Sequence, residues 1–130
     1  MKKQASLIAL VLFLGGAVVL GSDALAPDQL AAAPGGGVFV AERGGVVHFV
    51  SPGGSEITRF AELEVFTLGE CGLLGIALDP EYRINGFVYC FATVSDREQR
   101  IIRWRNENGL GVDPVVIREN LPTNGSVHNG

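Results

Sequence analysis

The chain has 130 residues, which limits it to one small domain at most. Its formal net charge at pH 7 is −4, and removal of residues 1–26, which contain Lys2, Lys3 and Asp23, leaves −5 and no lysine. Because nucleic-acid binding rewards a positive surface, we expect no nucleic-acid partner.

The N-terminus carries two lysines and then a run without polar side chains over residues 7–20. A charged start followed by a short apolar run is typical of a secretory signal peptide, and "ALA" at 24–26 is a candidate cleavage site. We therefore expect residues 1–26 to be a signal peptide and residues 27–130 to be an exported domain, secreted or periplasmic. An uncleaved membrane anchor is the alternative, although a spanning helix needs about 20 apolar residues. After cleavage we expect no stable membrane association.

Eighteen glycines punctuate short apolar runs, a pattern that indicates tight turns between strands. Residues 28–33 are interpreted as a strand or an irregular lead-in, and residues 106–114 as a loop. The sequence predicts further strands at residues 37–42, 46–50, 56–60, 72–79, 86–94, 100–105 and 115–120.

These strands form two groups of four, whose starts lie about 45–50 residues apart. Four strands at that period are typical of a β-propeller blade, and "LLGIAL" has the small and apolar residues of an innermost strand. We therefore predict an all-β fold with about two propeller blades. Two blades leave an open apolar sheet face, so we expect a truncation at the start of a third blade. A complete small β-sandwich is the alternative.

Cys71 and Cys90 lie in the exported part, where a disulfide is permitted. If residues 79 and 86 face each other across a hairpin, Cys90 lies opposite residue 75. About 13 Å of strand then separates the two thiols, which is too far for a bond. We expect two packed thiols rather than a disulfide.

The charged residues and histidines of the sequence do not form a recognisable metal-binding pattern. Four arginines cluster within residues 97–105, but acidic residues alternate with them, which indicates a solvated strand face. Neither His48 nor His128 lies at metal-ligand spacing from a cysteine. Asp79 opens an Asp-Pro turn and fails the calcium-loop pattern. We predict no metal site within this chain.

Four motifs occur in order: "VFVAERGGVVHFV", "GECGLLGIALDPEYRINGFVYCFAT", "IIRW" and "ENLPTNGSVHNG". Over residues 28–130 they resemble the soluble glucose/sorbosone dehydrogenases. The resemblance implies an exported six-bladed β-propeller that oxidises a sugar with pyrroloquinoline quinone (PQQ) and calcium. It also implies that the residues that clasp the quinone carboxylates and the calcium ion lie in later blades, so this chain alone is expected to bind neither tightly.

The resemblance implies roles for two residues. His128 would take the proton from the sugar C1 hydroxyl while hydride passes to the quinone, which suits a side chain that titrates near neutral pH. Glu70 would reach the quinone and the sugar. The alternatives from the residues alone are a loop histidine and a solvated turn glutamate.

Two positions depart from the family pattern. Val127 stands immediately before His128, where relatives with glucose activity tend to have an acidic residue, and Glu70 stands where relatives can have an amide. The alternative function is therefore a non-catalytic extracellular propeller that serves as a binding module.

Overall fold

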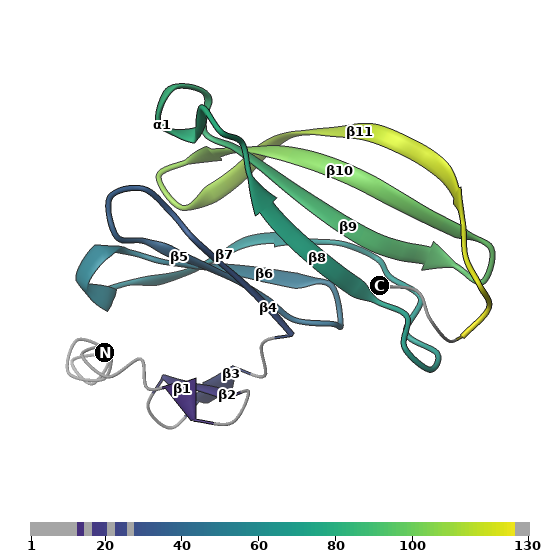
Figure 1. Cartoon of the computed structure of the whole chain (residues 1–130). Coiled ribbons are helices and arrows are strands. Elements are labelled where there is room, and N and C mark those ends of the chain that lie inside the picture. The colour runs from purple at the N-terminus through teal and green to yellow at the C-terminus, as the bar shows by residue number, and fades with distance from the viewer. Residues whose placement is uncertain (1–12, 15–16, 21–22, 26–27, 127–130) are drawn as a thin grey trace.

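Two four-stranded antiparallel sheets make up most of the molecule, and in each sheet the strands are neighbours in chain order (Figure 1). The computed structural model describes residues 13–14, 17–20, 23–25 and 28–126. The first sheet contains β4 (Gln29–Ala32), β5 (Val38–Ala41), β6 (Val46–Val50) and β7 (Ile57–Glu62), and the second contains β8 (Leu73–Leu78), β9 (Phe87–Ser95), β10 (Glu98–Glu107) and β11 (Leu110–Pro122). The predicted all-β fold with two blades is confirmed.

The N-terminal segment contributes a separate three-stranded sheet. Its strands are β1 (Phe13–Leu14), β2 (Ala17–Leu20) and β3 (Asp23–Leu25). The expected signal peptide falls on these strands and on residues outside the described ranges. Within the described ranges, no helix has the length and apolar character needed to cross a membrane.

The predicted loop at residues 106–114 is wrong. β10 continues to a two-residue turn at Asn108 and Gly109, whose φ angles of 53° and 86° lie in the left-handed region that a tight hairpin requires. Pro114 is tolerated inside β11 because that strand forms the sheet edge, where a missing N–H need not break a ladder bond. Asp113, with φ of 51°, lies beside an irregularity in the register. The Asn-Gly turn therefore makes residues 106–114 part of the β10–β11 hairpin.

The inner faces of the two sheets share one apolar core. Phe39 of β5 is fully buried, and its ring centroid lies 4.8 Å from that of Phe49, 4.9 Å from that of Phe60 and 6.0 Å from that of Tyr82. Trp104 of β10 belongs to the same cluster. Alternate residues of each strand point to this core, as the period of a β-strand requires. The residues that both sheets contribute are Ala33, Phe39, Ala41, Val47, Phe60, Ala61, Leu63, Leu73, Val88, Cys90, Ala92 and Trp104.

The turn between β8 and β9 is built around one carboxylate. Asp79 Oδ1 accepts hydrogen bonds from the backbone N–H of Glu81 and from Asn85 Nδ2, both at 2.9 Å, and Oδ2 accepts one from the Tyr89 hydroxyl at 2.9 Å. The helical turn α1 (Tyr82–Asn85) follows and ends at Gly86, whose φ is 67°. The structural reading of Asp79 is confirmed.

Cys71 and Cys90 are both buried and are not joined by a disulfide, as the sequence predicted. Their predicted register is wrong by one position, because Cys90 pairs with Ile76 rather than with residue 75. The helical turn α1 fixes this register, and its length could not be read from the sequence. Burial raises the pKa of the Cys90 thiol to about 12, so this thiol stays protonated and unreactive.

Candidate active site where three segments meet

Three segments from different parts of the chain meet beside the start of β8. They are the turn at residues 42–45 between β5 and β6, the loop at residues 69–72 before β8, and residues 124–126 after β11. Figure 1 shows the chain that enters β8 and the chain that leaves β11 at the same end of the second sheet. We call these three segments the candidate active site.

Arg43 connects the first sheet to the loop. Its carbonyl accepts a hydrogen bond from the backbone N–H of Leu73 at 2.9 Å, and its Nη1 donates to the carbonyl of Gly69 at 2.5 Å. The fit is close, since a Cβ at Gly72 would lie 2.5 Å from the Arg43 carbonyl oxygen and the φ of Gly72 is 141°. The first glycine of "GLLG" is therefore needed for this contact.

Glu70 lies in the exposed part of the loop, and its backbone is held by the third segment. Its N–H donates to the carbonyl of Ser126 at 2.8 Å, and Cys71 Sγ lies 3.5 Å from the carbonyl of Gly125. Ser126 precedes His128 by two residues, but His128 and Val127 lie outside the described residues. The structure thus brings Glu70 against the segment that leads to His128.

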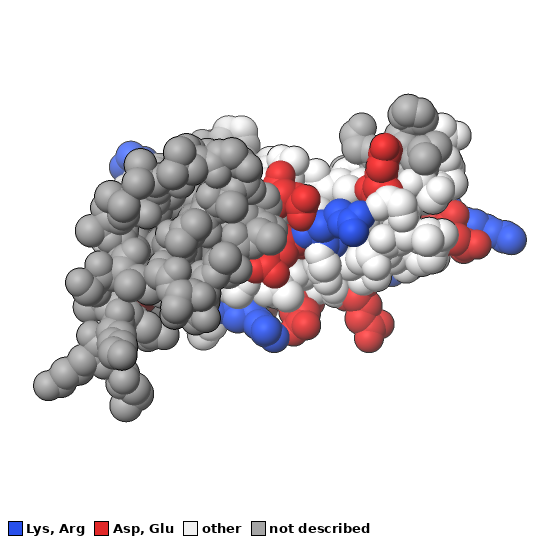
Figure 2. Space-filling view, turned by 90° about the horizontal axis from the view of Figure 1, so that it is seen from below, with Lys and Arg blue, Asp and Glu red and all other residues white. Residues whose placement is uncertain are grey.

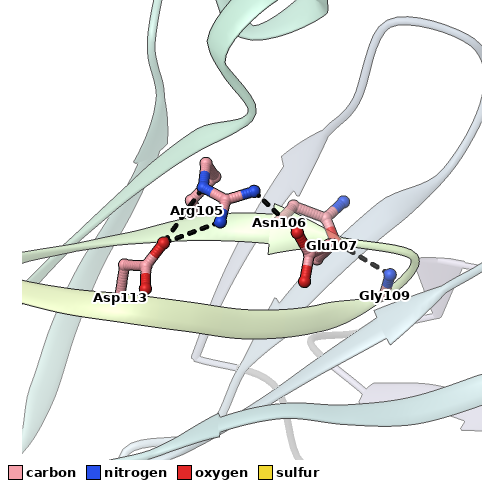
Figure 3. Close-up of polar contacts among 5 residues, drawn as sticks. All are labelled: Arg105, Asn106, Glu107, Gly109 and Asp113. Atoms are coloured by element: carbon pink, nitrogen blue, oxygen red, sulfur yellow. Dashed lines mark hydrogen bonds and ion pairs between the residues drawn. The ribbon is translucent and has the colours of Figure 1, made fainter.

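The arginines of β10 do not form a cationic site. Arg105 donates to Asp113 at 2.7 Å and to Glu107 at 2.9 Å, and Figure 3 shows its guanidinium between these carboxylates. Arg100 pairs with Glu98 at 2.6 Å, which raises the pKa of Arg100 and lowers the pKa of Glu98. Basic and acidic side chains are likewise interspersed on the face in Figure 2. Arg103 instead lies over the Phe87 ring, 4.0 Å from its centroid, with its Nε buried. The predicted pairing of charges on this strand therefore holds for Arg100 and Arg105, whereas Arg103 packs against an aromatic ring.

Arg43 differs from Arg100 and Arg105. In the described part of the chain it forms no ion pair with a carboxylate, although its side chain is exposed. It is the cation of the candidate active site. The sequence showed Arg43 only as part of a family motif, and we assigned it no role in the site from that motif.

A cavity of about 530 Å³ lies away from the candidate active site, at the other end of β8 and beside α1. Three polar side chains of its lining are used in internal bonds, because Asn106 Nδ2 donates to the Tyr82 hydroxyl at 2.6 Å and Arg105 is paired as described above. Among the described residues, no group of three His, Cys, Asp or Glu side chains could hold a metal ion.

Comparison with known proteins identifies the family. A family model described as glucose/sorbosone dehydrogenase matches residues 25–130. The chain belongs to the glucose/sorbosone dehydrogenase family. The resemblance stated from the sequence is therefore confirmed, and the two sheets are part of a β-propeller of this family. None of the curated proteins compared with the chain matches it.

Two solved structures of this family type are similar to the chain. A Thermus thermophilus protein assigned as an oxidoreductase (glucose dehydrogenase) has 34% identity and a TM-score of 0.68, over 78% of this chain and 31% of that one. The PQQ-bound aldose sugar dehydrogenase of Streptomyces coelicolor has 33% identity and a TM-score of 0.68, over 78% of this chain and 32% of that one. The chain thus spans about a third of the length of each.

Proposed function

We propose that this chain forms the first two blades of an exported, PQQ-dependent sugar dehydrogenase that oxidises the C1 hydroxyl of a sugar. The family membership and the names of the two similar structures support this reaction class. The observation that carries the assignment to this site is the hydrogen bond from Glu70 N–H to the Ser126 carbonyl, which joins the loop of Glu70 to the segment that leads to His128.

In this proposal His128 and Glu70 act on the sugar. Neutral imidazole can accept the proton of the C1 hydroxyl at physiological pH, which is the role of His128. The Glu70 carboxylate accepts hydrogen bonds from sugar hydroxyls and so orients the substrate. PQQ, when bound, supplies the hydride acceptor, because no protein side chain can take a hydride.

The described residues do not supply the cations that such a cofactor needs. PQQ carries three carboxylates, and the guanidinium of Arg43, the cation of the candidate active site, donates to the Gly69 carbonyl instead. Glu70 is acidic and would repel a nearby carboxylate. We therefore propose that later blades supply the cations and the calcium ligands. The charged, then apolar, N-terminus supports export after cleavage near residue 26.

Replacement of His128 tests the proposed base. His128→Ala in the natural protein, supplied with PQQ and calcium, should lower dye-coupled sugar oxidation by at least about 100-fold, since a general base contributes that much or more. The circular dichroism spectrum and melting temperature should stay unchanged. Arg83→Gln is the control, because Arg83 is exposed on α1 at the other end of β8. Unchanged oxidation by His128→Ala would refute the role.

The activity of the unmodified protein distinguishes a sugar dehydrogenase from a non-catalytic binding module. If the natural protein oxidises no sugar even with PQQ and calcium, the binding module becomes the better description. Binding of sugars measured by calorimetry would then be the appropriate assay.

Replacement of Glu70 tests its position beside the cofactor. Glu70→Gln removes one negative charge near an anion, so PQQ should bind about three- to tenfold more tightly. The measurement is a titration followed by the absorbance of the quinone. Glu64→Gln is the matched control, since Glu64 is exposed in the connection between β7 and β8 but precedes the loop. Weaker binding by Glu70→Gln would contradict the repulsion and indicate a favourable contact from the carboxylate.

A further inference from the structure

We propose, on the basis of the proposed function, that Arg43 is a positioning residue of the candidate active site. Its guanidinium fixes the loop at residues 69–72, which carries Glu70, and through this loop it fixes the backbone at residues 124–126. Arg43 acts through these segments rather than on the sugar.

Arg43 holds the loop at both of its ends. The Nη1 donor bonds the carbonyl of Gly69, immediately before Glu70, and the Arg43 carbonyl accepts the N–H of Leu73, just after the loop. The backbone of Arg43 is itself held, because its N–H donates to Asp28 Oδ2 at 2.7 Å. Arg43, in the turn between β5 and β6, therefore holds both ends of the loop that precedes β8.

The loop depends on such anchors because it has little structure of its own. Residues 67–70 are exposed, whereas Cys71 and Gly72 are buried, and Cys71 N–H donates to the Leu68 carbonyl at 3.1 Å, outside any strand. Exposed segments outside strands open at low free energy. A charge-assisted hydrogen bond from a guanidinium is stronger than a neutral one. Its loss should therefore make residues 69–72 open more readily.

The loop in turn holds the segment before His128. In addition to the two contacts of Glu70 and Cys71 with this segment, Gly69 packs so closely that a Cβ there would overlap the Ser126 carbonyl oxygen. A displaced loop must therefore displace residues 124–126. The position of Arg43 is therefore coupled to the backbone of Glu70 and to that of residues 124–126.

Hydrogen–deuterium exchange of the natural protein tests the positioning. Arg43→Ala keeps the backbone contact with Leu73 and removes the guanidinium together with its aliphatic stem. Amides in residues 66–73 and 123–126 should exchange about tenfold faster, as expected for one lost hydrogen bond. Arg43→Lys should restore part of the protection. Arg83→Ala on α1, at the other end of β8, is the matched loss of an exposed arginine and should change neither segment.

Two results of the exchange experiment would overturn the proposal. One is unchanged exchange in both segments. The other is an equal increase throughout β9 and β10, which would mean that Arg43→Ala destabilises the whole fold rather than the loop.

Kinetics then separate this inference from the proposed function. For an active dehydrogenase, Arg43→Ala should lower kcat about tenfold or more while KM for the sugar changes little, because misplaced groups act mainly in the transition state. Unchanged kcat and KM together with faster loop exchange would refute a role in the site. If the unmodified protein oxidises no sugar, the proposed function fails, and the exchange data alone decide whether Arg43 positions the loop.

Discussion

At the residue scale, Asp79 shows how one carboxylate organises a turn. The hydrogen bond from Asn85, then that from the backbone of Glu81 and that from Tyr89, lower the pKa of Asp79. The same hydrogen bond with Asp79 raises the pKa of Tyr89. These bonds favour the ionised carboxylate and close the connection between β8 and β9.

The lowered pKa of Asp79 predicts a pH dependence of stability. The ionised carboxylate stabilises the folded state at pH values above its ordinary pKa of 3.8, and this contribution is lost as the pH falls through the lower folded-state pKa. Asp79→Asn should therefore lower the melting temperature at neutral pH, and the difference from the unmodified protein should shrink below that pKa. Calorimetry over a pH series measures this. Glu81→Gln is the control, because only the backbone of Glu81 contacts Asp79. A difference that grows in acid would contradict the assignment.

At the element scale, the β10–β11 hairpin joins the two blades. The Thr58 hydroxyl of β7 donates to the carbonyl of Gly109 at 2.8 Å, so the tip of the hairpin lies against the first sheet. Asn106 supports the same tip, since its side-chain oxygen accepts the N–H of Gly109 at 2.8 Å (Figure 3). The hairpin turn is thus also a contact between the blades.

Substitution of Gly109 separates these two roles. Gly109→Ala should destabilise the protein by about 2–4 kcal/mol, from strain at positive φ and from a Cβ that would lie 2.7 Å from Thr58 Oγ1. Gly53→Ala, in the 3₁₀ turn η1 (Pro52–Gly54), has a similar φ of 74° and no atom within 4 Å of the new Cβ, so about 1 kcal/mol is expected. Urea unfolding measures both. Equal losses would mean that the contact between the blades contributes nothing.

At the scale of the whole molecule, the sequence predicted the two blades but not how they are joined. Alternating apolar residues and turn glycines are local signals, and they located the strands and their grouping into fours. The register at Cys90 was missed because it depends on the helical turn α1. The loop prediction at 106–114 missed the hairpin turn that Asn108 and Gly109 form.

The candidate site was predictable only in part. Glu70 and His128 were named from the family resemblance, and the structure shows that the loop of Glu70 contacts the segment before His128. The contact of Arg43 with Gly69 joins residues 26 positions apart. No periodicity or motif spacing encodes which carbonyl a long side chain reaches across two sheets, so this role required the three-dimensional structure.

The contact between the loop before β8 and the chain after β11 also suggests an order of events during folding. Cys71 and Gly125 are 54 positions apart, so closing this contact costs more chain entropy than pairing neighbouring strands. The hairpins of both sheets pair neighbouring strands and can form first. The candidate active site is then completed after the sheets that support it, when residues 124–126 reach the loop.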